Sequence, residues 1–158
     1  MAYIAKLTNA GGVSTVTRYV DMLAGNAAFV ENSYESIATV TSPAATSVTF
    51  SGIPSTYTHL QIRGIANNGE ASGYNNQSLR FNGDTSANYA YHRLAGDGAT
   101  VSASGTANAT SINDVFRIPP AGSTFGVFVI DILDYTSTTK AKTIRSLNGG
   151  DSNGSGWI

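Results

Sequence analysis

The chain has 158 residues, a formal net charge of -1 at pH 7, only 12% charged residues and no cysteine. The length suits one domain with an additional arm, and the near-neutral charge argues against a surface for duplex nucleic acid or an anionic membrane. The lack of cysteine excludes disulfides, thiol catalysis and cysteine-ligated zinc.

The first segment, residues 1–32, is predicted to be an arm that precedes the main domain. It lacks the basic start and long apolar core of a secretory signal. The chain nowhere approaches the ~20 consecutive apolar residues of a membrane helix, so we expect no membrane insertion. Four residues of the arm fall at helical spacing behind two possible helix caps: Val16, Tyr19, Val20 and Leu23.

This short helix is the predicted assembly anchor of the arm. About ten residues are too few for a stable isolated helix, so the helix must dock on something. Two partners remain open: it closes one end of the chain's own β domain, or it attaches the protein to another subunit.

From residue 33 onward, short runs of strand-forming residues alternate with turn-forming Gly, Asn and Pro. Residues 33–158 are therefore predicted to form an all-β domain, an antiparallel β-sandwich or jelly roll. The segment 99–111, rich in Ser, Ala and Thr, is predicted to be a long exposed loop. Eight strands are predicted: 36–41, 47–51, 59–66, 78–81, 88–94, 112–118, 124–135 and 141–147.

The most apolar run, residues 124–133, is predicted to be the central strand. Val127 and Val129 would occupy one face, and Phe128 and Ile130 the other. A strand that is apolar on both faces lies in a sheet covered on each side, or has one face in a subunit interface. Polar turn residues and a second strand follow, which predicts a central hairpin.

The glycine-rich run 148–156 is predicted to be a flexible turn before the start of another strand. We expect either that the sequence is part of a longer chain or that its last residues lodge in a neighbouring subunit. Three residues of the run have the alternate spacing of calcium ligands: Asp151, Asn153 and Ser155. The twelfth-position glutamate of a calcium loop is missing, so calcium is the weaker alternative to a plain turn.

The spacing of the histidines and aspartates that could take part in catalysis indicates structural roles instead. Neither histidine has the spacing of a metal site. Asp131 and Asp134 would project from opposite faces of a regular strand, whereas paired-carboxylate catalysis needs them to converge. We expect Asp131 to pair with Arg145 or Lys142 across the hairpin, because an isolated buried carboxylate is costly. The protein is therefore predicted not to be an enzyme and to need no cofactor.

Three tyrosines in or beside loop-rich segments are candidates for surface recognition: Tyr74, Tyr89 and Tyr91. A tyrosine is rigid and amphipathic, which suits contact with sugars or protein surfaces. For any one of them, core packing is the expected role and surface recognition is the alternative.

Four motifs cover much of the chain after residue 32: SYESIATVT (33–41), VTFSGIPSTYTHLQIRGIA (48–66), LRFNGDTSANYAYHRLAGDG (79–98) and VFVIDILDYTSTTKAKTIRSLNGGDSNGSG (127–156). Together they resemble a group of virion structural proteins of tailed bacteriophages, often met in marine and cyanobacterial phages. The resemblance implies a non-enzymatic β-sandwich on the outside of a virus particle, made in the host cytoplasm. Members of the group usually continue for several strands beyond the last motif, and this chain departs from that pattern.

The leading hypothesis is a tail fibre or similar external appendage, attached to other virion proteins through residues 1–32 and assembled as a homotrimer. It would hold the particle to a host surface, for example to a cell-surface glycan, by weak multivalent contacts. One alternative is a head decoration protein that clamps capsid subunits through the arm. Another is a carbohydrate-active enzyme of the particle, which would need two converging carboxylates.

Overall fold

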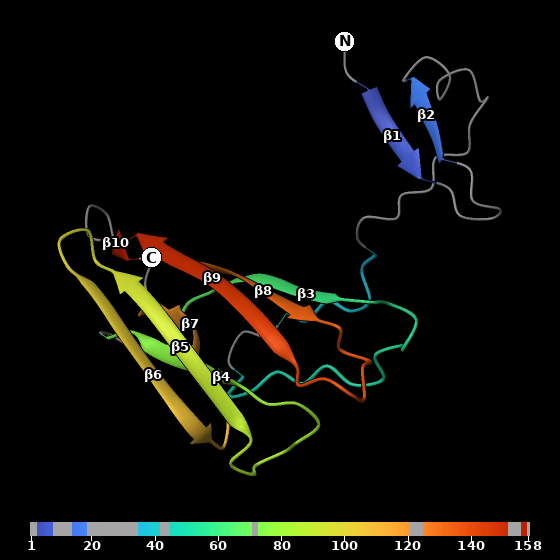
Figure 1. Ribbon diagram of the computed structural model, residues 1–158. Coiled ribbons are helices and arrows are strands. Elements are labelled where there is room, and N and C mark those ends of the chain that lie inside the picture. Colours follow the sequence, from blue (N-terminus) through green and yellow to red (C-terminus); the bar gives the residue numbers. More distant parts are fainter. Residues whose placement is uncertain are drawn as a thin grey trace. The chain divides into compact units, whose positions relative to one another are not determined.

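The computed structural model shows an all-β protein whose strand pairs are antiparallel, as predicted (Figure 1). The residues that it describes are 3–7, 14–18, 35–41, 45–70, 73–120, 125–151 and 156–157, with the backbone alone at 3–7, 14–18, 151 and 156–157. The chain divides into two compact units, Met1–Ser51 and Gly52–Ile158. The arm boundary expected after residue 32 falls outside the described residues and stays a prediction.

The described part of the first unit includes a hairpin, in which β1 (Tyr3–Leu7) pairs with β2 (Ser14–Arg18). Among the described residues the prediction of a helix is wrong, because the anchor candidate Val16 lies in strand β2. Its neighbours Thr15 and Thr17 are also β-branched, and a run of such residues favours a strand over a helix. The other three anchor candidates, Tyr19, Val20 and Leu23, lie outside the described residues.

Two further strand predictions in the first unit are wrong. The described residues of 36–41 and 47–51 have no strand conformation and pair with none of the described strands. An alternating apolar pattern can favour an extended chain, but a strand needs a neighbour to satisfy its backbone groups. No described segment of the chain is a helix that could span a membrane.

The second unit is organised around a four-stranded sheet with the order β10–β9–β8–β3. Its strands are β3 (Leu60–Ala66), β8 (Gly126–Leu133), β9 (Thr143–Asp151) and β10 (Gly156–Trp157). The predicted hairpin is confirmed, because β8 pairs with β9 along its whole length. The central position of β8 is confirmed too, since its other edge pairs with β3.

Two smaller sheets complete this unit. In one, β4 (Asn75–Leu79) pairs with β7 (Ile112–Ile118), and in the other β5 (Tyr89–Gly96) pairs with β6 (Val101–Ala109). The predicted loop at 99–111 is therefore wrong, because most of it is β6. Its small side chains are almost all exposed, so the sequence shows no alternation of apolar and polar residues, although the backbone pairs regularly.

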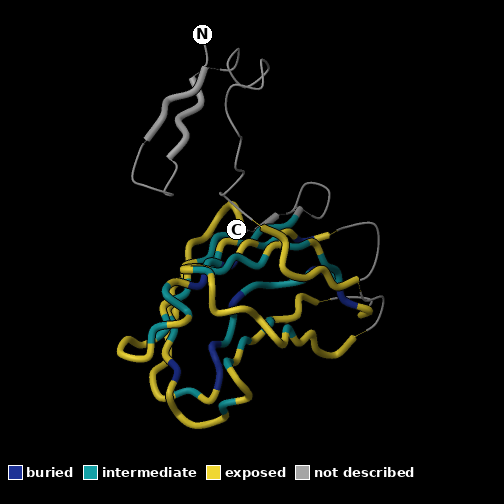
Figure 2. Tube along the Cα trace, turned by 90° about the vertical axis from the view of Figure 1, so that its right-hand side faces the viewer, coloured by how far each residue is buried: buried dark blue, intermediate teal, exposed yellow. Residues whose placement is uncertain are grey.

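The core of this unit lies where β7 contacts β8 and β9. It is formed by five buried residues: Tyr89, Ile112, Val115, Ile130 and Ile132. The rings of Phe116 and Phe128 stack against this core with their centroids 3.9 Å apart and their planes 12° from parallel. Among the described residues, the buried ones, dark blue in Figure 2, lie inside this unit.

Candidate functional site

The four-stranded sheet has one covered face and one open face. Along β8, Ile130 is only 1% exposed, while Val127, three positions before it, is 55% exposed. Residues directly opposite in paired strands share a face, and successive residues alternate between faces. Phe128, Ile130 and Ile132 therefore face the core, and Val127 and Val129 face away from it.

The open face carries an apolar patch drawn from three adjacent strands. Ile65 of β3 lies opposite Val127 of β8, and Val129 of β8 lies opposite Leu147 of β9. Ile65 is 70% exposed and Leu147 is 67% exposed. We call Ile65, Val127, Val129 and Leu147 the outer apolar patch. The expectation that the central strand is covered on both sides is thus not met within one copy of the chain.

A polar cluster borders the patch on the same face. The Asp131 carboxylate accepts a hydrogen bond of 2.8 Å from Gln61 Nε2 and one of 2.9 Å from Arg145 Nη2. The hydrogen bond from Gln61, and then the charged hydrogen bond from Arg145, lower the pKa of Asp131 below its usual value. The cross-strand pair predicted between Asp131 and Arg145 is confirmed. One carboxylate thereby links β3, β8 and β9 beside an exposed apolar surface.

The second carboxylate of the central hairpin is engaged elsewhere. Asp134 Oδ2 lies 3.2 Å from Lys140 Nζ, and the Asp134 backbone N–H donates to His59 Nδ1 over 3.0 Å. Lys142, the other expected partner of Asp131, donates to the backbone oxygens of Asp134 and Ser137 in the turn. Asp131 and Asp134 are therefore held by different cations and act as parts of the sheet and of its turn.

A bulge in β7 positions an ion pair between two sheets. The β4–β7 register shifts after Gln77, and within the bulge Asp114 has a positive φ of 55°. This conformation turns Asp114 toward β5, where its Oδ2 lies 3.3 Å from Arg93 Nη1, and both side chains are mostly buried. Bulges commonly re-aim a side chain in this way. The pair ties the β5–β6 hairpin to β7.

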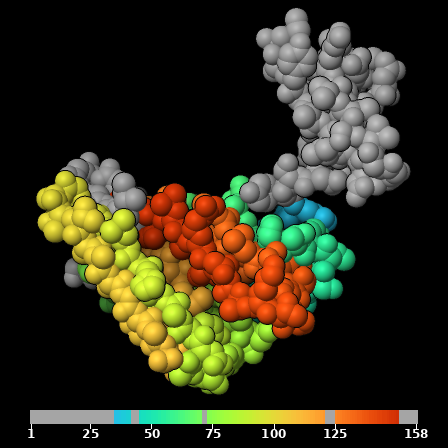
Figure 3. Space-filling view, viewed as in Figure 1, coloured from blue at the N-terminus to red at the C-terminus, as the bar shows by residue number. Residues whose placement is uncertain are grey.

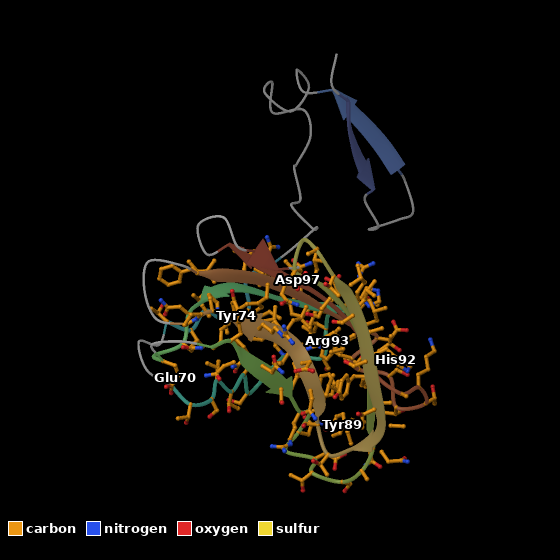
Figure 4. The ribbon with its side chains drawn as sticks, turned by 90° about the vertical axis from the view of Figure 1, so that its left-hand side faces the viewer. Glu70, Tyr74, Tyr89, His92, Arg93 and Asp97 are labelled. Carbon is orange, nitrogen blue, oxygen red and sulfur yellow. The ribbon has the colours of Figure 1, made fainter. Side chains whose placement is uncertain are left out.

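The three tyrosine candidates lie in different environments, and Figure 4 labels two of them, Tyr74 and Tyr89. Tyr89 is buried in the core, and its hydroxyl accepts a 3.1 Å hydrogen bond from the Phe81 backbone N–H. Tyr91 is half-buried and packs against the same core. Tyr74 is exposed. Of the three, only Tyr74 therefore offers a large part of its ring to a surface ligand, and its role in recognition stays a prediction.

The calcium candidate lies at the β9–β10 connection. Asp151 pairs with Gly156 in the backbone register of these strands, so the residues between them join two antiparallel strands. The Asp151 side chain, Asn153 and Ser155 lie outside what the structure describes. Among the described residues, no group of three His, Asp or Glu side chains could hold a metal ion.

Sequence reasoning missed half of the outer apolar patch. Ile65 and Leu147 lie two positions after Arg63 and Arg145, so period-two alternation does place them on the open face. The predicted strands 59–66 and 141–147 already carry this signal. Comparison with protein-family models, curated proteins and solved structures gave no match.

Proposed function

We propose that the protein is a virion structural protein of a tailed bacteriophage, built into a tail fibre or similar external appendage. Residues 1–32 attach it to other proteins of the tail or capsid, and residues 33–158 form a β-sandwich domain that assembles as a homotrimer. The appendage acts in attachment to a host surface. It needs no cofactor, no nucleic acid and no insertion into a membrane.

The observation that carries this proposal is the outer apolar patch. Exposed apolar side chains that are scattered singly are ordinary, but a contiguous group marks a surface that another protein covers. The patch spans three hydrogen-bonded strands, and the Asp131 cluster at its border resembles the polar rim of a protein interface. Three copies arranged about a threefold axis would cover the open face of each sheet with its neighbours.

The motifs described for residues 33–156 support the assignment of this assembly to a phage particle. The low content of charged residues is also in line with a protein that works inside a larger assembly. Host attachment through many weak sites requires only a modest site on each copy. Exposed Tyr74 is the side chain that we assign to such a site, with a cell-surface glycan as its ligand.

Location and copy number in purified particles test the assignment. Antibodies against residues 52–158 should label an appendage in electron micrographs, and quantitative mass spectrometry should give a low copy number per particle. A copy number that matches the capsid subunits would replace the appendage with the head decoration alternative. Absence of the chain from purified particles would contradict both.

The trimer is tested through the outer apolar patch. The double variant Ile65→Lys, Leu147→Lys places two charges on the open face and should lower the native mass threefold, because a buried unpaired charge opposes assembly. The control Thr136→Lys, Thr138→Lys adds the same charges at exposed positions of the β8–β9 turn. Equal masses for the two variants would rule out the patch as the trimer interface.

A further inference from the structure

The outer edge of β6 is an unpaired strand edge. β6 pairs with β5 along its whole length, from Val101 opposite Gly96 to Ala109 opposite Tyr89. The other edge of β6 pairs with none of the described strands. In an antiparallel pair, alternate residues direct their N–H and C=O groups away from the partner. Figure 3 shows β6, in yellow to gold, along the border of the β5–β6 hairpin on the molecular surface.

From Val101 to Thr106, this edge carries none of the features that usually protect a strand edge against pairing. The β6 sequence VSASGTANA contains no Lys, Arg, Asp, Glu or Pro, and eight of its nine residues are exposed. Natural edge strands generally carry a charge, a proline or a bulge, or are covered by another element. The single irregularity, a bulge with Asn108 at a φ of 56°, lies near the end of the strand. From Val101 to Thr106 the register is unbroken.

The solvent face of the same hairpin is apolar. Leu94 lies opposite Ala103, and Val101 is two residues before Ala103, so all three share one face. Leu94 is 75% exposed and Val101 is 73% exposed, the highest values among the large apolar side chains that the structure describes. Two strands alone cannot cover these side chains.

We propose that β6 pairs with β6 of a second copy of this chain, antiparallel and about a twofold axis at Ala103. The two hairpins then join into one sheet with the order β5–β6–β6–β5. Extended strand edges are a common means of association, in which backbone hydrogen bonds supply affinity and side chains set the register.

The sequence around Ala103 identifies a second copy as the partner. Antiparallel pairing about an axis places opposite each other the residues that are equally far from it. Here Ser102 meets Ser104 and Thr100 meets Thr106, so hydroxyl groups face hydroxyl groups on both sides of the axis. Such cross-strand Ser and Thr pairs stabilise a sheet. The segment TVSASGT therefore reads nearly the same in both directions.

The one unequal pair in this register is also complementary. Val101 would meet Gly105 of the second copy. The ring of His92 covers Gly105, since a Cβ at that position would lie only 2.5 Å from His92 Cδ2. The Val101 methyl groups would thus contact an imidazole face in place of a missing side chain. The exposed Leu94 side chains of both copies would lie on this same face of the joined sheet.

This pairing is independent of the proposed virion role and of the outer apolar patch, which lies on another sheet. If both surfaces are used, trimers are linked in pairs. Charges on β6 should then halve the native mass, whereas charges on the outer apolar patch should lower it threefold. The two proposals therefore fail separately.

A cysteine on the twofold axis gives the sharpest test, because the chain has no other cysteine. In the full chain carrying Ala103→Cys, the Cα atoms of the two introduced cysteines would lie about 5.5 Å apart, a separation that allows a disulfide to form under mild oxidation. The control Ala90→Cys places a thiol at an exposed position of β5, away from the edge. A covalent dimer should form in the first variant and not in the second. Equal rates, or no dimer in either, would overturn the proposal.

A charge exchange tests the register without a covalent bond. The variant Ser102→Lys, Ser104→Lys and the variant Ser102→Glu, Ser104→Glu should each have half the native mass of the wild type, because like charges lie opposite each other. Their equimolar mixture should regain the full mass. Thr136→Lys, Thr138→Lys serves as the charge control, and circular dichroism verifies the fold. An unchanged mass in either double variant, or no recovery on mixing, would count against pairing through β6.

Discussion

The β8–β9 and β5–β6 hairpins have the same strand lengths, eight and nine residues, yet opposite surroundings. In the first, alternate residues such as Ile130 and Ile132 are buried in the core. In the second, β5 contributes Tyr89 to the core while β6 remains almost wholly exposed. In this unit the β8–β9 hairpin packs on the core through alternate residues, whereas the β6 strand of the other hairpin pairs only with β5 among the described strands.

The largest expected contrast follows from removing side-chain volume in each hairpin. Ile130→Ala leaves a cavity beside Ile132 and should lower the free energy of unfolding by about 2–5 kcal/mol. Leu94→Ala removes an exposed side chain and should change it by less than about 0.5 kcal/mol. Urea denaturation of both variants at one chain concentration measures the difference. Similar losses would show that the two hairpins are equally packed.

A smaller effect is expected at the ion pair that joins the hairpins through β7. Asp114→Asn keeps a residue that tolerates the positive φ but leaves Arg93 mostly buried without its counter-charge. The expected loss is about 1–3 kcal/mol. A double-mutant cycle with Arg93→Gln isolates the pair, since the second substitution should cost little once the first is present. Additive losses would show that the two side chains do not stabilise each other.

Gly64 tests how tightly the covered face is packed. A Cβ at Gly64 would lie 2.7 Å from Phe128 Cζ, and Phe128 is already stacked on Phe116. Gly64→Ala should therefore force the ring from its place and cost about 1–2 kcal/mol. At Gly69 an added Cβ meets nothing within 4 Å, so Gly69→Ala is the matched control and should be near neutral. Thermal unfolding of the two variants compares them.

The smallest expected effect is on how the stability of the protein depends on pH. The folded-state pKa of Asp131 lies below 3.8, the ordinary value for an aspartate, so its contribution to stability is present above that pH. The contribution is lost as the pH falls through the folded-state pKa. Asp131→Asn should therefore be less stable than the wild type at neutral pH, and the difference should shrink below pH ~4. Urea midpoints measured over this pH range check the sign, and a difference that grows with acid would contradict it.

The central hairpin could be predicted from the sequence because a continuous apolar run is followed by polar turn residues and a second strand. The strand β7 was predicted with its observed bounds, and the Asp131–Arg145 pair followed from the hairpin register. The exposure of Val127 could not be predicted. An apolar strand face has the same sequence pattern whether it is covered by the chain's own core or by a partner subunit. Tyr89 is buried in the core, so its role in surface recognition is not supported. Its burial could not be predicted, because it depends on packing against residues that are distant in the sequence.

β6 was missed for the opposite reason. Its small residues carry no periodicity, and the strand is formed by pairing that begins at a tight turn. In that turn the Asp97 carboxylate accepts hydrogen bonds from the backbone N–H groups of Ala99 and Thr100, and these bonds lower the pKa of Asp97. An Asp-Gly dipeptide such as Asp97–Gly98 favours a tight turn, but the strand that follows it has no apolar periodicity to mark it in the sequence.

The pairing of β3 with β8 also limits when the strands of this unit can pair during synthesis. Gln61 and Asp131 are 70 positions apart, so β3 has no partner until most of the chain has been made. The β5–β6 hairpin needs only neighbouring residues, and hairpins form within about 1–10 μs. During synthesis, the first ordered element of this unit is therefore the one with an open edge. Nascent chains on adjacent ribosomes could join through it before either has closed its core.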